Sequence, residues 1–345
     1  MADELDPSSP DPTIERRPNY GVEDLTIAIN TVDRPEYLAA CVQSLIDTTP
    51  EGVSLQILFN STEPAIRERT IAQVADWQGP TKFIHIDEII PIDESHNAAF
   101  AAVETSLVNF MGDDDVVLGN RVPLIIEAFN SVEPLPSVIT TFARRIAGDP
   151  HNPIIGSNKD LGPTTVQEWR EWHESGRAFE LLWPGSVLRV DALRSLGGWE
   201  PEFAMSFDNR IFSQMSFHGP VLALPDRQFG FRIHQGSLST SKWKGQREVV
   251  RYVAACHEAN VAGVPEPKFA DFQAGERNDP AWKRYSRALR DESGLNFRVG
   301  GAKFLSGDRV AGALHLVKAA VLWPPAFVEK VRDQFGRGAL PLPRR

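Results

Sequence analysis

Three consecutive carboxylates are the clearest chemical signal in this chain. Gly112-Asp113-Asp114-Asp115 directly follows an apolar run at residues 107–111, which has the character of a short buried strand. Adjacent carboxylates repel one another, so a fold tolerates them mainly where a cation neutralises them. Their hard oxygen atoms suit Mg²⁺ or Mn²⁺, and both ions commonly bridge to phosphate oxygens. The acids therefore predict a site for a metal and a phosphate, and an acidic turn or helix start is the alternative.

The segments that must position these acids alternate between strand and helix patterns. Strand patterns lie at residues 25–29, 55–59, 82–86 and 107–111, and helix patterns at 35–47, 64–77 and 97–104. Alternation at this short spacing is typical of βα units and predicts an α/β fold with a mostly parallel sheet flanked by helices. Ligands of open α/β sheets bind beyond the carboxyl ends of the strands, which is where the acids would lie.

The rest of the chain is divided between a mixed segment and a helical one. Helix patterns lie at 121–130, 166–174, 191–196 and 208–217, and strand patterns at 137–145 and 186–189. Residues 148–162 are rich in Gly, Pro, Asn and Asp, so we expect a loop there. Further helix patterns follow at 247–262, 280–292, 304–322 and 326–335. We expect a flexible N-terminal arm at 1–22, an α/β domain at 23–245 and a C-terminal helical region at 246–345.

Composition narrows the class of protein. The 345 residues are 42% hydrophobic and 24% charged, as in an ordinary soluble domain. A net charge of −10 argues against nucleic acid as a partner. The two cysteines are too few for a disulfide framework and favour a reducing compartment. The acidic, Pro-rich start is unlike a signal peptide, and no apolar run approaches the roughly 20 residues of a membrane span. We expect a cytoplasmic protein.

The segment after the first strand lacks the glycines of a phosphate cradle. Residues 30–35 read Asn-Thr-Val-Asp-Arg-Pro, where dehydrogenases and P-loop kinases carry a Gly-rich turn. Sugar nucleotidyltransferases also use a Gly-rich loop at this point, so the absence of glycines here also weighs against that class.

Seven segments in order resemble a family-two glycosyltransferase of the GT-A fold. They are residues 31–35, 60–63, Asn97, 112–115, the Gly-Gly-Trp turn within 193–203, the helix start at 206–211 and the His-containing segment 231–239. The resemblance implies a catalytic domain with a nucleotide-binding half at 23–120 and an acceptor half at 121–245. It also implies metal-dependent, inverting transfer of a sugar from a nucleoside diphosphate to an acceptor hydroxyl.

The resemblance also implies roles for individual residues. Asp113, Asp115 and His234 would hold Mn²⁺ or Mg²⁺, although a surface or core role for His234 stays open. Asp208 would be the catalytic base, and its alternative role is an N-cap of the helix that follows. The residues expected to contact the donor are Thr31, Asp33, Arg34, Asn60, His96, Asn97, Asp113, Asp114, Gly185 and Ser186.

Two departures from the family pattern leave details open. The acid that usually ends the second strand is replaced by Phe59 or Asn60, so uridine is favoured as the nucleoside only by its frequency in the family. Phe207 replaces the Glu that usually precedes the base. The Gln-x-x-Arg-Trp motif of processive synthases is absent, which favours transfer of a single sugar to an acceptor that the sequence does not identify. A sugar nucleotidyltransferase and a non-catalytic carbohydrate- or metal-binding protein are the alternatives.

Aromatic residues leave further alternatives open. Trp183 and Trp199 either stack on a sugar or pack in the core. Residues 317–327 are apolar with basic flanks, so they form a helical-hairpin seam, a peripheral membrane contact or a homodimer contact.

Overall fold

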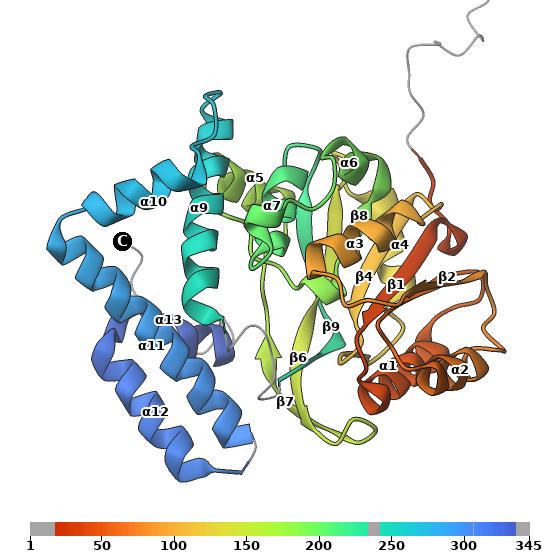
Figure 1. Cartoon of the computed structure of the whole chain (residues 1–345). Coiled ribbons are helices and arrows are strands. Elements are labelled where there is room, and N and C mark those ends of the chain that lie inside the picture. Colours follow the sequence, from red (N-terminus) through yellow and green to blue (C-terminus); the bar gives the residue numbers. More distant parts are fainter. Residues whose placement is uncertain (1–17, 234–241, 306, 336–345) are drawn as a thin grey trace, which may run out of the picture.

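The computed structural model describes residues 18–233, 242–305 and 307–335 (Figure 1). His234, one of the three predicted metal ligands, lies outside these residues. Tyr20, near the start of the described residues, makes two backbone hydrogen bonds of 2.8 Å with the side chain of Asn130, which lies on the helix Arg121–Ser131. Tyr20 is buried against the ring of Phe129, so this part of the predicted arm is docked on the domain.

Four parallel strands form the N-terminal half of the sheet: β1 (Leu25–Thr31), β2 (Ser54–Asn60), β3 (Thr81–Ile86) and β4 (Leu107–Gly112). They lie in the order β3-β2-β1-β4. The helices between and after them are α1 (Pro35–Thr48), α2 (Pro64–Gln73), α3 (Ile92–Ala101) and α4 (Arg121–Ser131). Proline occupies the first turn of α1 and α2, where its missing N–H costs no hydrogen bond. The predicted βα units are therefore confirmed.

The other half of the sheet mixes strand directions. It contains β5 (Val116–Val117), β6 (Val138–Gly148), β7 (Pro153–Lys159), β8 (Val187–Arg189) and β9 (Val221–Arg232). The sheet continues from β4 as β8-β6-β9-β5, with β7 pairing antiparallel to β6. The predicted loop at 148–162 is wrong, because β7 lies within it and forms a hairpin with β6. Strand β9 was not predicted.

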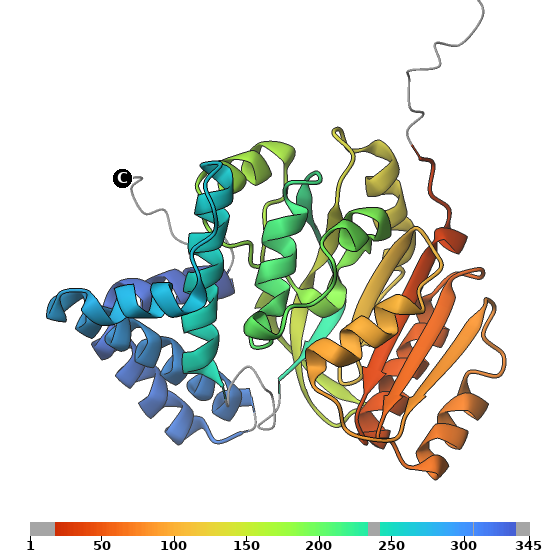
Figure 2. The same ribbon diagram turned by 45° about the horizontal axis from the view of Figure 1, so that its top comes forward.

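Apolar side chains on both faces of the sheet make two cores (Figures 1 and 2). Successive residues of a strand point to opposite faces. Ile27 and Ile29 of β1 therefore pack with α1 and α4, whereas Ala28 packs with α3 on the other face. The second core also includes the helices α6 (Val190–Ser195) and α7 (Phe207–Met215), and α5 (Val166–Glu174) flanks both cores through Trp169.

The C-terminal region is helical, as predicted. Its helices are α9 (Trp243–Val261), α10 (Phe269–Asn278), α11 (Ala281–Leu305), α12 (Arg309–Leu322) and α13 (Pro324–Phe335). Helix α9 packs on α7, and the ring of its Tyr252 stacks on Phe203 with centroids 5.2 Å apart. Figure 1 shows the remaining helices beside the sheet domain. Within the described ranges, every helix is too short or too polar to cross a membrane.

Candidate active site

The acid cluster lies at the carboxyl end of β4, as predicted. Asp113 is fully buried and accepts a hydrogen bond of 2.7 Å from the Thr31 hydroxyl, at the end of neighbouring β1. Arg34 contacts both oxygens of Asp113 and also donates from Nη1 to Asp114 at 2.9 Å. The structure therefore brings Thr31, Arg34, Asp113 and Asp114 together as one charged group.

Asp115 is bound by a residue from the other half of the sheet. Its Oδ1 accepts a hydrogen bond of 2.8 Å from the backbone N–H of Arg232, at the end of β9. The Arg232 guanidinium donates to the Asp114 carbonyl at 2.6 Å and lies over the ring of Tyr37. No donor among the described residues contacts Asp115 Oδ2, so this oxygen remains available to a ligand.

Burial and repulsion between the carboxylates raise the pKa values of the acid cluster, and the nearby cations do not fully offset this. Burial, opposed by Arg34 and reinforced by Asp114, raises the pKa of Asp113 to about 6. Burial also raises the pKa of Asp115 well above its usual range, with Asp114 adding to the effect. A cation would stabilise the ionised form of both groups.

The residues fit a metal ion only in part. Asp115 offers a free hard oxygen, but both oxygens of Asp113 are occupied by Arg34 and Thr31. Among the residues with described positions, no three His, Cys, Asp or Glu side chains gather as a metal-binding group. Of the three predicted metal ligands, Asp115 is the described residue that could contact a metal, and His234 lies outside the described residues.

Two loop residues at the ends of β1 and β2 adopt left-handed backbone conformations. Asp33 has φ +42° and Ser61 has φ +53°, although neither is glycine. A left-handed residue other than glycine costs roughly 1–2 kcal/mol, and such strain gathers at functional sites. Asp33 is exposed beside Arg34, so its contact with a donor stays a prediction.

Asp208 lies in the first turn of α7. The helix begins at Phe207 after the N-cap Ser206, so the alternative role of Asp208 as the N-cap is wrong. Burial, with repulsion from Glu180, raises the pKa of Asp208 to about 6. A carboxylate with such a pKa accepts a proton readily near neutral pH, which suits a general base.

Lys159, at the end of β7, links the two acidic groups electrostatically. Its amine lies 3.6 Å from the ring centroid of Phe231 on β9. Burial, with repulsion from Arg298 and Arg145, lowers the pKa of Lys159 to about 7, while Asp115 and Asp208 act in the opposite direction. The amine is therefore within electrostatic range of both carboxylates. Sequence reasoning missed Lys159, because it lies in the segment that was expected to be a loop.

The amides Asn60 and Asn97 each hold a backbone segment in place. Asn60 exchanges two hydrogen bonds of 3.1 Å with the backbone of Ile90. Asn97 bonds to the N–H and carbonyl of Trp199, within the Gly-Gly-Trp turn. These contacts give both residues a structural role, and their contacts with a nucleotide remain predictions.

His96 lies inside a cluster of aromatic rings. Its ring centroid is 4.8 Å from Phe207 and 5.4 Å from Trp199, and Trp183 and Phe110 complete the surroundings. Burial lowers the pKa of His96 to about 4, so the side chain is neutral at physiological pH. Trp183 and Trp199 are buried in the same cluster, which favours core packing over stacking on a sugar.

A fully buried arginine, which the sequence analysis did not single out, connects α4 with the acid strand β4 and the turn at Gly185. Arg121 donates from Nη1 to the Gly185 carbonyl at 2.8 Å and contacts the side chain of Asn109 on β4. Ser186 is also buried, and its hydroxyl donates to the Leu182 carbonyl at 2.7 Å. Gly185 and Ser186 thus belong to a turn tied to the acid strand, and donor contacts by either residue stay predicted.

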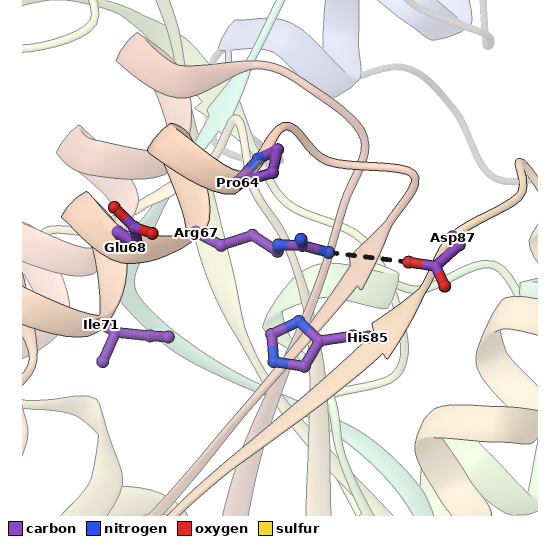
Figure 3. A pocket seen from close by; sticks show the side chains of 6 residues that line it. All are labelled: Pro64, Arg67, Glu68, Ile71, His85 and Asp87. Atoms are coloured by element: carbon purple, nitrogen blue, oxygen red, sulfur yellow. Dashed lines mark ion pairs between the residues drawn. The ribbon is translucent and has the colours of Figure 1, made fainter.

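A shallow pocket opens elsewhere, at the edge strand β3. It has a volume of about 380 Å³ and is lined by Pro64, Arg67, Glu68, Ile71, His85 and Asp87. Figure 3 shows Arg67 reaching toward Asp87 across it, at 3.9 Å. Strands β2 and β1 separate β3 from the acid strand β4, so this pocket is not part of the acid site.

The fold, with its acid cluster at the end of β4, is similar to the GT-A fold of glycosyltransferases of known structure. The chain resembles the crystal structure of S. aureus TarS 1-349 in complex with UDP-GlcNAc, with a TM-score of 0.53 and 11% identity over 90% of this chain and 92% of that one. The crystal structure of S. aureus TarS 1-349 without the nucleotide sugar gives a TM-score of 0.51 and 12% identity, covering 89% and 91%.

One curated sequence is also similar over part of the chain. The teichoic acid poly(glycerol phosphate) polymerase of Staphylococcus epidermidis is 24% identical over 118 residues, which are 34% of this chain and only 16% of that protein. No protein-family model matches the chain. The predicted GT-A resemblance is confirmed at the level of the fold.

Proposed function

We propose that this protein is an inverting glycosyltransferase that moves one sugar from a nucleoside-diphosphate sugar to an acceptor hydroxyl. The observation that carries the proposal is the buried acid cluster at the end of β4, which Thr31 and Arg34 hold in a fold similar to that of TarS. Lys159 adds a nearby basic group whose pKa responds to both Asp115 and Asp208.

Each residue then has a defined task. The Asp208 carboxylate takes the proton of the acceptor hydroxyl as that oxygen attacks the anomeric carbon. The bond from the anomeric carbon to the diphosphate oxygen breaks on the opposite face, which inverts the configuration. Lys159 balances the negative charge that develops on the departing nucleoside diphosphate. A divalent metal at Asp115, where a free carboxylate oxygen is present, would supply further charge neutralisation to that leaving group.

Uridine is the nucleoside that we propose. The resemblance to TarS, whose structure contains UDP-GlcNAc, supports this choice together with the frequency of uridine in the family. Thr31, at the end of β1, and Arg34 hold Asp113 at the end of β4, where the base and ribose would approach.

Ligand-dependent stabilisation tests the proposal before any acceptor is known. We expect UDP with Mn²⁺ to raise the melting temperature, because a ligand at a hundredfold excess over its Kd stabilises by about 2.7 kcal/mol. UDP in EDTA should have a smaller effect, and CDP and GDP serve as nucleoside controls. If no nucleoside diphosphate stabilises the protein, the proposal is rejected in favour of a carbohydrate- or metal-binding protein. Release of pyrophosphate from a sugar phosphate and UTP would instead identify a nucleotidyltransferase.

A further inference from the structure

One face of α12 exposes an apolar stripe to solvent. Val310, Leu314, Val317 and Val321 are 76%, 66%, 62% and 76% exposed. Each helical residue is rotated by about 100° from the one before, so these four lie within about 60° of one another. Residues 317–327, for which a helical-hairpin seam was one expectation, therefore contribute Val317 and Val321 to a helix face outside that seam.

The opposite face of α12 makes the seam. Gly312 and Ala319 are buried there, and a Cβ on Gly312 would come within 3.0 Å of the Gly300 carbonyl on α11. Ser293 of α11 donates to the Ala319 carbonyl at 2.8 Å. This close packing fixes the rotation of α12, so the stripe cannot turn inward without breaking the α11–α12 contact. Figure 1 shows α12 at the rim of the molecule.

Both charged residues of α12 are cations, and the acid that caps the helix, Asp308, contacts Lys303 at 3.4 Å. Residues 309–327 contain no Asp or Glu, although the whole chain has a net charge of −10. Arg309 and Lys318 are both exposed on this helix, and Lys318 makes only a 3.4 Å contact with Glu292. An apolar stripe flanked by cations complements a surface that offers both acyl chains and anionic headgroups.

We propose that the α12 stripe, defined by Val310, Leu314, Val317 and Val321, binds the surface of an anionic lipid bilayer. A second copy of the chain fits less well, because a two-fold contact between stripes would bring Arg309 and Lys318 of both copies together without an acid from residues 309–327 to pair with them. The stripe would lie in the bilayer interface, with the cations at headgroup level. This binding is independent of the proposed sugar transfer.

Vesicle sedimentation of the full chain tests this assignment. We expect binding to phosphatidylcholine vesicles that contain about a third phosphatidylglycerol, and at least about tenfold weaker binding to pure phosphatidylcholine. The double variant Leu314→Ser/Val317→Ser should bind the anionic vesicles about tenfold or more weakly. Arg309→Gln/Lys318→Gln should weaken binding at low salt and reduce its salt dependence. The control Val264→Ser changes a 52%-exposed valine outside the stripe and should bind as the wild type does.

Two results would overturn the assignment. One is equal sedimentation of the wild type and Leu314→Ser/Val317→Ser, including no sedimentation of either, while circular dichroism shows both to be folded. The other is a dimeric wild type in light scattering that becomes monomeric in the double variant, which would assign the stripe to a second copy. Neither measurement depends on turnover, so failure of the proposed sugar transfer would be seen separately.

Discussion

Asp208 is the residue on which the proposed mechanism depends most. A positioned base is worth roughly 10²–10⁴ in rate, so Asp208→Asn should lower kcat by about that factor and leave the Kd of the donor nearly unchanged. The wild-type kcat should fall as the pH drops below about 6, because protonation then removes the base. Steady-state kinetics and proton NMR of the linkage check both points. A fully active variant, or retained anomeric configuration, would place the base elsewhere.

The same carboxylate should make the folded protein less stable at neutral pH. Burial raises its pKa from 3.8 to about 6, so the folded state binds more protons than the unfolded state between these values. Its contribution to stability therefore falls as the pH rises through this window. Asp208→Asn should be more stable than the wild type by about 1–3 kcal/mol at pH ~7.5, since one pKa unit corresponds to about 1.4 kcal/mol.

Denaturation across pH measures this effect directly. The advantage of Asp208→Asn should shrink on acidification and disappear below pH ~4, where Asp208 is protonated in both states. A variant that is less stable than the wild type at neutral pH would show that the carboxylate makes stabilising contacts instead.

Substitutions of Lys159 can separate the effect of its charge on catalysis from the effect of its packing. Lys159→Met keeps most of the side-chain volume against Phe231 but removes the ammonium that lies near Asp115 and Asp208. We expect kcat/KM for the donor to fall by about tenfold to a thousandfold, because charge that stabilises a leaving group acts strongly in a partly buried site. Lys159→Arg should recover part of this loss. Equal kinetics for Lys159→Met and wild type would exclude Lys159 from the site.

At the scale of elements, the N-terminal half was predictable from local patterns. Strands β1, β2 and β4 are buried on both faces and appear in the sequence as short continuous apolar runs. Strand β9 is different, because Pro225, Asp226 and Arg227 interrupt its apolar pattern, and its pairing with β6 shifts register near Phe142. Its first four residues, 221–224, form a short apolar run, but the continuation past Pro225 is stabilised by pairing with β6 and β5 and has no local signal.

The residues of the candidate site also differ in whether the sequence could predict them. Asp113–Asp115, Thr31 and Arg34 follow strands that could be predicted, so their meeting at one sheet edge could be predicted as well. Lys159 and Arg232 come from β7 and β9, and only the pairing of these strands with β6 brings them to the acids. The resemblance included Arg232 in the segment 231–239 without giving it a role, and Lys159 could not be found without the pairing of β7 with β6.

Helix α7 is held in place by an ion pair from outside the sheet domain. Arg210 is two residues from Asp208, and its guanidinium contacts both oxygens of Glu266 at 2.7 and 3.0 Å. The Arg210 side chain is only 9% exposed, so removing the charge of Glu266 leaves a poorly solvated guanidinium with Glu200, at 3.1 Å, as its remaining acidic partner. We expect Glu266→Gln to lower the free energy of unfolding by about 1–3 kcal/mol, as measured by urea denaturation.

An exposed ion pair provides the control for this prediction. Lys82 and Glu104 are 2.6 Å apart, but their side chains are 43% and 83% exposed. Exposed pairs contribute little, so Glu104→Gln should leave the urea midpoint unchanged. If both variants behaved alike, the contact between Arg210 and Glu266 would not be what holds α7.

At the scale of the whole molecule, the predicted boundary at residue 245 divides a packed core. Helix α9 begins at Trp243, and its Val249, Val253 and Cys256 are buried against Ala178 of the sheet domain. The boundary followed the change from mixed strand and helix patterns to helix patterns alone, and the sequence has no local sign that the first helix after it belongs to the core. The later helices α11 and α12 pack mainly on each other.

Two truncated chains distinguish a core helix from an appended one. Residues 1–245 would lack nearly all of α9 and expose the apolar side chains that it covers, so we expect this chain to aggregate or to melt without cooperativity. Residues 1–279 keep α9, α10 and the pairing of Arg251 with Glu276 at 2.7 Å, so this chain should fold. Its donor binding reports on Arg298, because removing this cation relieves its repulsion of Lys159 and should raise the pKa of Lys159. Circular dichroism and titration with nucleotide measure both effects. A cooperative, nucleotide-binding 1–245 chain would restore the predicted boundary and would make α9 an accessory to the fold.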